Sequence, residues 1–197
     1  MEQCEEQLKG RFDQLEANAK PHTVEEVQRF LLIESEVHEI NTQYLQHALA
    51  CVVFSAMAVE GYIFDYAALR TSKAYVEENL DKMDTVAKWV VVPRLITGKE
   101  LGRGRHCMQL LDDLVKTRNK LVHYKSRDIG DTSDAVDPVV DGLPDKARKA
   151  IQALNELAKD LDSLDSTAKA AEGIGKEAWG TLRSPHGGQM SSITRPK

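Results

Sequence analysis

Apolar residues recur at every third or fourth position along most of this chain, which is the spacing of α-helices that bury one face. The clearest case is the segment 105–125, whose apolar positions are Cys107, Met108, Leu110, Leu111, Leu114, Val115, Leu121 and Val122. The run from Trp89 to Val92 is β-branched and would also suit a strand, but no second strand pattern exists for it to pair with. The sequence therefore predicts an all-α protein.

Capping residues and prolines mark where the predicted helices begin and end. Residues 1–22 alternate charged positions with sparse apolar ones, which predicts a surface helix that ends at Pro21. Thr23 and Glu26 have the spacing of a capping box and predict the start of the next helix. Residues 40–69 contain no proline and mix small with large apolar side chains, so they are predicted to form a long, closely packed central helix.

The second half of the chain supplies further helices. Ser72 can cap a short helix through Asn79. Residues 85–96 are predicted to be helical with a break at Pro93, and Pro144 is expected to open a last helix with a regular apolar stripe. Together with the segment 105–125, these elements predict a bundle of four or five core helices.

Length and composition predict one folded domain with irregular ends. A chain of 197 residues is long enough for one well-buried core and short for two. We expect an N-terminal helical extension in residues 1–22, a helical domain in residues 23–172, and a flexible tail in residues 173–197, where Gly, Ser, Thr and Pro dominate.

Charge and cysteine content narrow the class of protein. The formal net charge of -5 argues against a generally basic coat for nucleic acid, so any anion binding must come from local clusters. Three cysteines without a CxxC pair suit a reducing cytoplasm better than a disulfide framework. No secretory signal or membrane-spanning segment is expected, because the most apolar stretch contains Ser55, Glu60 and Asp65.

The segment 118–125 places polar side chains where the apolar stripe of its helix would continue. Arg118 falls on that stripe, and Asn119 and His123 are four residues apart on one side of the helix. Arg118 and His123 point about 140° from each other, so they can flank one groove without lying on one line. In the simplest alternative, Arg118 pairs with a core carboxylate and His123 lines the core. Glu60, a carboxylate in the most apolar part of the chain, either faces solvent or pairs with a donor such as Arg118.

Common enzyme signatures are absent from the sequence. No GxSxG, HExxH or GxGxxG pattern in the right context can be found. His47 and Cys51 are four residues apart but have no second ligand pair, so no metal site and no cofactor are expected. The glycine-punctuated basic stretch 98–105 is either a solvated loop or a loop that contacts an anion.

The polar segment resembles the motif of a known superfamily. Arg118-Asn119-Lys120-Leu121-Val122-His123 is similar to the RxxxxH motif of HEPN domains, in which the arginine, a following polar residue and the histidine line a cleft. The stretch 58–63, with Glu60, looks like the glutamate-bearing core helix of these domains. Lys88 and Trp89, with the following Pro93, resemble the lead-in of some members. The resemblance covers about residues 40–125.

This resemblance implies a HEPN-like helical bundle that acts as a metal-independent endoribonuclease, commonly as a symmetric homodimer. Arg118 would bind the phosphate, His123 would act as acid or base, and Asn119 would orient the imidazole or donate to the phosphate. Glu60 would orient Arg118. The side chains expected to contact RNA are those around the motif, namely Lys116, Lys120, Tyr124, Lys125 and Arg127.

Two function hypotheses follow. The first is a ribonuclease with a role in stress or defence, such as a toxin held by an antitoxin. The second is a non-catalytic HEPN-like dimer that binds RNA, a nucleotide or a protein. In toxins of the family that are controlled by a nucleotidyltransferase, a tyrosine stands two residues after the histidine. Lys125 occupies that position here, so this form of regulation is not expected.

Overall fold

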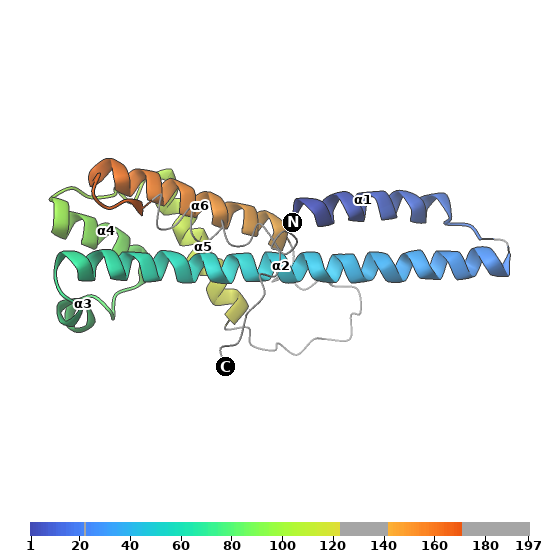
Figure 1. Cartoon of the computed structure of the whole chain (residues 1–197), viewed down its shortest axis with the longest axis horizontal. Helices are drawn as coiled ribbons and strands as arrows, with labels where there is room; N and C mark the ends of the chain where they lie inside the picture. The colour runs from blue at the N-terminus through green and yellow to red at the C-terminus, as the bar shows by residue number, and fades with distance from the viewer. Residues whose placement is uncertain (22, 123–141, 171–197) are drawn as a thin grey trace, which may run out of the picture. The chain divides into compact units, whose positions relative to one another are not determined.

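The computed structural model describes residues 1–21, 23–122 and 142–170, and all regular secondary structure within them is α-helical. The all-α prediction is therefore confirmed (Figure 1). In chain order, the helices are α1 (Glu2–Ala17), α2 (Val24–Arg70), α3 (Lys73–Asn79), α4 (Thr85–Thr97), α5 (His106–Val122) and α6 (Leu143–Leu164).

Two predicted capping interactions are confirmed. The Thr23 amide donates to the Glu26 carboxylate at 3.1 Å, and the Glu26 amide donates to the Thr23 hydroxyl at 3.2 Å, which completes a capping box. α2 begins at Val24, directly after Thr23, and continues for 47 residues, so the two helical segments expected here are one helix. Before α3, the Ser72 hydroxyl accepts a hydrogen bond from the Tyr75 amide at 3.1 Å.

The helix predicted around Pro93 is confirmed, but the predicted break is wrong. α4 continues through Pro93 and ends at Gly98, which adopts a left-handed conformation with φ of 74°. A proline in a helix removes one amide donor and crowds the preceding turn. Here the proline ring is fully buried, and the Thr97 hydroxyl donates to the Pro93 carbonyl at 2.8 Å. Burial of the ring therefore offsets the lost backbone hydrogen bond.

The chain forms two compact units, and the first comprises residues 1–57 and 108–153. Here α1 lies alongside the N-terminal half of α2 (Figure 1). Their shared core is small and contains Leu8, Ile33, Val37 and Tyr44. The Tyr44 hydroxyl donates to Glu5 at 2.7 Å, and the Arg148 guanidinium of α6 donates to the same carboxylate. These bonds join α1, α2 and α6 within the first unit.

The second unit comprises residues 58–107 and 154–197, of which those to 170 are described. Trp89 of α4 is completely buried, and its indole nitrogen donates to the Val59 carbonyl of α2 at 3.1 Å. The Tyr62 ring stacks on Trp89 with 6.3 Å between ring centroids. The hydrogen bond to Val59 satisfies the indole nitrogen, which is the one polar atom of the buried ring.

The domain boundaries predicted at residues 22/23 and 172/173 fall at or beside residues outside the described ranges, so they stay predictions. α2 also contains an 18-residue window with a mean hydropathy of 1.6, of which 33% is buried. By length and composition this helix could cross a membrane, although the core helix of a folded domain meets the same criteria.

Candidate functional site

α5 carries the predicted apolar stripe on its buried face. Met108, Leu111 and Leu114 are each at most 4% exposed. Lys116, Asn119 and Lys120 lie on exposed parts of the same helix. The N-terminal part of the predicted stripe is therefore buried as expected, whereas its last residue, Val122, is 56% exposed.

Two of the three predicted motif side chains contact each other on α5. The Arg118 guanidinium donates to the Asn119 amide oxygen at 2.9 Å. Arg118 is partly buried and Asn119 is exposed. This hydrogen bond directs one nitrogen of the guanidinium toward Asn119.

The remaining predicted residues of the motif lie beyond the end of α5. His123, Tyr124, Lys125 and Arg127 are outside the described residues, and their predicted roles stay predictions.

Glu60 has a lysine partner that the sequence did not predict. Its side chain is 40% exposed and forms an ion pair with Lys88 at 3.7 Å. Lys88 comes from α4, is 3% exposed, and also pairs with Asp81 at 3.8 Å. The buried ammonium is thus compensated by two more exposed carboxylates, as burial of a charge requires. The predicted orientation of Arg118 by Glu60 stays a prediction.

A hollow of about 250 Å³ lies between α5 and α6 in the first unit, and lysines from both helices line it. α5 contributes Lys116 and Lys120, which were predicted to bind RNA, and α6 contributes Lys146 and Lys149. A role in binding for the two lysines of α6 was not predicted from the sequence. Their spacing of three residues indicates one side of a helix. However, only the packing of α6 against α5 places them opposite Lys116 and Lys120.

Acidic neighbours modify the charge of this hollow. Lys116 donates to Asp112 one turn earlier at 2.5 Å, and this hydrogen bond raises the pKa of the lysine. Asp113 is the acidic residue in the lining. Four lysines against these two carboxylates leave the hollow with a net positive charge at neutral pH.

Arg118 points in a different direction from the lysines of the hollow, although it lies one turn after Leu114, which also lines the hollow. It follows Thr117, which lines the hollow, and therefore points about 100° away from Thr117 around the helix axis. By the same count, Lys116 and Lys120 each point about 160° from Arg118. The predicted phosphate-binding arginine and the predicted RNA-binding lysines thus occupy different faces of α5.

A second hollow, of about 400 Å³, lies in the second unit at the start of α5. It is lined by Arg105, His106, Cys107, Glu156, Lys159 and Asp160. The buried Cys107 thiol donates to Asp160 at 3.1 Å, and Arg105 forms an ion pair with the same carboxylate at 3.0 Å. Charges of both signs compensate each other here, so the hollow has no strong preference for an anion. Among the described residues, no three His, Cys, Asp or Glu side chains group in a way that could hold a metal ion.

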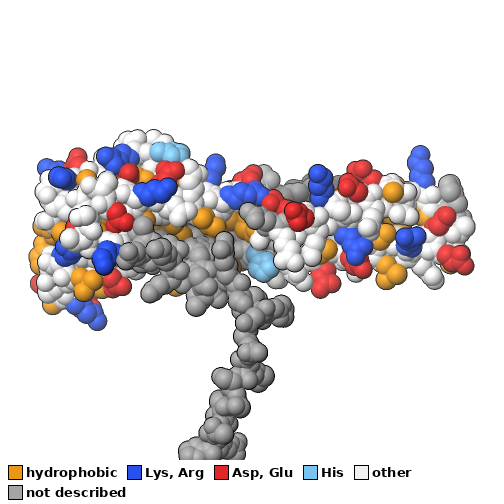
Figure 2. Space-filling model, turned by 45° about the horizontal axis from the view of Figure 1, so that its top comes forward, with side chains coloured by type: hydrophobic (Ala, Val, Ile, Leu, Met, Phe, Trp, Pro, Cys, Tyr) orange, Lys and Arg blue, Asp and Glu red, His pale blue; other side chains and the backbone are white. Residues whose placement is uncertain are grey.

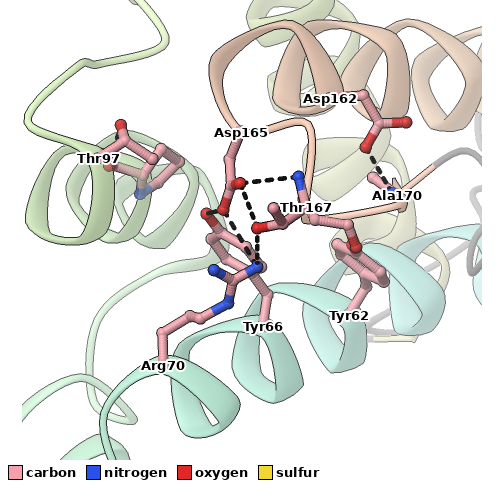
Figure 3. Close-up of polar contacts among 10 residues, drawn as sticks. Tyr62, Tyr66, Arg70, Thr97, Asp162, Asp165, Thr167 and Ala170 are labelled. Carbon is pink, nitrogen blue, oxygen red and sulfur yellow. Dashed lines mark hydrogen bonds and ion pairs between the residues drawn. The ribbon is translucent and has the colours of Figure 1, made fainter.

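A third polar cluster lies where α6 ends. Figure 3 shows Tyr66 and Arg70 of α2 pointing toward Asp165, which follows α6. The Tyr66 hydroxyl donates to Asp165 at 2.7 Å, and Arg70 pairs with the same oxygen at 3.2 Å. The Thr167 hydroxyl and amide donate to the other oxygen at 2.6 and 2.9 Å.

These contacts set the protonation states of the cluster. Hydrogen bonds from Thr167 and Tyr66 lower the pKa of Asp165. Burial, and then the bond to Asp165, raises the pKa of Tyr66, and burial raises the pKa of Tyr62 to about 12. The carboxylate is charged and both phenols are neutral near pH 7. This arrangement fixes the end of α6 and offers no group that exchanges a proton near neutrality.

On the face drawn in Figure 2, basic and acidic side chains are interspersed. Comparison of the chain with protein-family models, curated proteins and solved structures found no match.

Proposed function

We propose that this protein is a metal-independent endoribonuclease of the HEPN type. The observation that carries the proposal is the hydrogen bond on α5 from the partly buried Arg118 to the exposed Asn119. These are the first two motif positions of a segment that continues, in sequence, to His123. A partly buried arginine with an oriented guanidinium is suited to bind a phosphodiester.

The proposed reaction divides the chemistry among three side chains. The RNA 2'-oxygen attacks the adjacent phosphorus while its proton passes to a base, and the bond from phosphorus to the 5'-oxygen breaks. The departing 5'-oxygen takes up a proton, and a 2',3'-cyclic phosphate remains. His123 acts in proton transfer because imidazole titrates near neutral pH. Arg118 binds the phosphate oxygens and stabilises the charge that builds on them. Asn119 positions Arg118.

The working unit in this proposal is a cytoplasmic homodimer, in which the motif helices of two chains face one groove. A second protein, such as an antitoxin, would hold the activity in check. Light scattering tests the dimer directly, since a monomer at micromolar concentration would contradict it.

Cleavage of single-stranded and structured RNA in the presence of EDTA tests the activity. The wild-type chain is compared with Arg118→Ala, His123→Ala and the control Arg103→Ala, which removes an exposed arginine from the loop before α5. Removal of one group that stabilises transition-state charge lowers the rate about 100-fold or more. We expect this loss in both motif variants and unchanged cleavage in the control. Equal cleavage by all four proteins would indicate a contaminant and contradict the proposal.

The second candidate function is an RNA-binding module without catalysis. The specific observation in its favour is that Lys116 and Lys120, which line the hollow, point about 160° from Arg118 around the axis of α5. Binding of RNA without cleavage by the wild-type chain would select this function over the enzyme.

A further inference from the structure

The hollow between α5 and α6 has charged walls and an apolar floor. Lys116 and Lys120 stand on one wall and Lys146 and Lys149 on the other. The floor and the remaining lining consist of Leu110, Asp113, Leu114, Thr117 and Ala150. Cations from two helices thus converge on one space, which is the arrangement that attracts a chain of phosphates.

The spacing of the lysines suits a ligand with repeated charge. Lys116 and Lys120 are four residues apart, and so about 6 Å apart along the axis of α5. Lys146 and Lys149 are three residues apart, about 4.5 Å along α6. A single phosphate could engage neighbouring lysines of the hollow, whereas a polymer backbone supplies further phosphates for the others.

The composition of the lining indicates which part of such a ligand, its backbone or its bases, would be recognised. Among the described residues that line the hollow, there is no aromatic, arginine, asparagine or glutamine side chain. Stacking on bases needs aromatic side chains, and recognition of base edges mostly uses arginine, asparagine and glutamine. The described part of the lining therefore offers cations that can bind a backbone, and none of the side chain types that usually recognise bases.

We propose that this hollow binds the sugar-phosphate backbone of single-stranded RNA without sequence preference, and that Lys146 and Lys149 are required for it. Single strands are favoured because all four cations converge on one hollow of about 250 Å³. A duplex would present its two phosphate rows farther apart. The inference rests on the proposed function in taking RNA as the substrate. The hollow contributes to the affinity for RNA, and the chemical step takes place at the face of α5 that carries Arg118.

Binding of a fluorescent 2'-O-methyl RNA tests the inference separately from cleavage, because the blocked 2'-oxygen cannot attack. Anisotropy titrations at several salt concentrations compare the wild-type chain with Lys146→Gln/Lys149→Gln. We expect about tenfold weaker binding and a salt slope smaller by about 1.4, the value for two lost phosphate contacts to a single strand. Lys146→Arg/Lys149→Arg, which keeps the charge, should bind like the wild type.

The matched control is Lys9→Gln/Lys159→Gln, which removes two exposed lysines outside the hollow. Circular dichroism shows whether every variant retains the helical fold. An equal loss of affinity in this control would show that only total charge matters, and it would overturn the inference. Unchanged binding by Lys146→Gln/Lys149→Gln would also overturn it.

Binding of different ligands distinguishes the proposed RNA backbone from the other possible ligands. Oligouridylate and oligoadenylate of equal length should bind with affinities within a few-fold. A strong preference for one base, for duplex RNA, or for a poly-glutamate peptide over RNA would overturn the inference.

Cleavage assays separate the failure of the inference from the failure of the proposed function. If the enzyme exists, Lys146→Gln/Lys149→Gln should raise KM with little change in kcat, whereas Arg118→Ala should lower kcat. Lysine-dependent binding without any cleavage would contradict the proposed enzyme and support the hollow. Cleavage with an unchanged KM in the lysine variant would support the enzyme and contradict the hollow.

Discussion

Lys88 shows how a single buried charge is accommodated in this protein. Its ammonium is almost completely buried, while the carboxylates of Glu60 and Asp81 that pair with it are 40% and 60% exposed. The desolvation cost falls mainly on the lysine, because both carboxylates keep contact with water. Lys88 therefore adds little net stability through charge, and its aliphatic stem contributes packing.

Substitution of Lys88 separates these two contributions. Lys88→Met keeps most of the volume and removes the buried charge, so the free energy of unfolding should change by less than about 1 kcal/mol. Lys88→Ala also removes packed methylenes and should lower it by about 2 kcal/mol. Urea unfolding measures both values. A large loss in Lys88→Met, equal to that in Lys88→Ala, would show that the ion pairs dominate.

Arg118 and Asn119 are expected to act as one group in RNA cleavage. Loss of the Asn119 amide removes the acceptor that orients the guanidinium, so Asn119→Ala should lower kcat about tenfold. Arg118→Ala should cost more, and the double variant should be no slower than Arg118→Ala alone. Single-turnover cleavage rates test this. Independent, additive losses would contradict the positioning role of Asn119.

The roles of some of these residues could be predicted from the sequence and those of others could not, for a physical reason. Arg118 stands out because it interrupts the apolar stripe of its own helix, and Asn119 because it is the next position of the motif. Lys146 follows the ordinary polar pattern of α6, and Lys88 lies in a β-branched run. Their roles depend on which helices pack together, as for Lys88 with Glu60, and periodicity within one helix does not contain that information.

At the scale of helices, the ends that depend on neighbouring residues were predictable, and those that depend on distant residues were not. The capping box before α2 involves residues three apart, so the sequence displays it. The end of α6 instead relies on Tyr66 and Arg70, almost 100 residues earlier. The continuation of α4 through Pro93 likewise depends on burial of the ring, which its own sequence does not specify.

The end of α6 should be sensitive to acid. The pKa of Asp165 is lower in the folded state, so its stabilising contribution is complete above the unfolded value near 3.8 and is lost as the pH falls through the folded pKa. Asp165→Asn should lower the free energy of unfolding by about 2 kcal/mol at pH 7, since hydrogen bonds to a charged group are weakened.

Urea unfolding of Asp165→Asn and wild type at pH 7 and at pH 3 measures this difference. The gap between the two proteins should narrow at the lower pH. Asp145→Asn serves as a control, because its carboxylate is 76% exposed and pairs with Arg148 three residues away on the same helix. A gap that is equal at both pH values would contradict the assigned role of Asp165.

At the scale of the whole molecule, each unit contains a carboxylate that is bound by a tyrosine hydroxyl and an arginine from other segments of the chain. In the first, a carboxylate, Glu5, accepts from Tyr44 and Arg148. In the second, Asp165 accepts from Tyr66 and pairs with Arg70. Both carboxylates have a lowered pKa, mainly through their hydrogen bonds. The division into two units was not predicted, because the total length suggested one core and the helices do not stop at the division.

The two units should nevertheless unfold together. α2 and α6 each contribute residues to both units, so melting of either helix removes packing from both. Trp179→Phe leaves Trp89, in the second unit, as the single tryptophan. Its fluorescence transition in urea should coincide with the circular dichroism transition of the whole chain. Midpoints that differ clearly would show that the units unfold independently.

The uninterrupted course of α2 has a consequence for dividing the chain. The division between the units falls between Met57 and Ala58, inside the helix and without a loop. A cut there would leave the new helix ends with about four unsatisfied amides and four unsatisfied carbonyls. Proteases that cleave exposed loops have no site at this division within the helix. Neither unit of this protein can therefore be released as a separate fragment by cleaving the chain at a linker in α2.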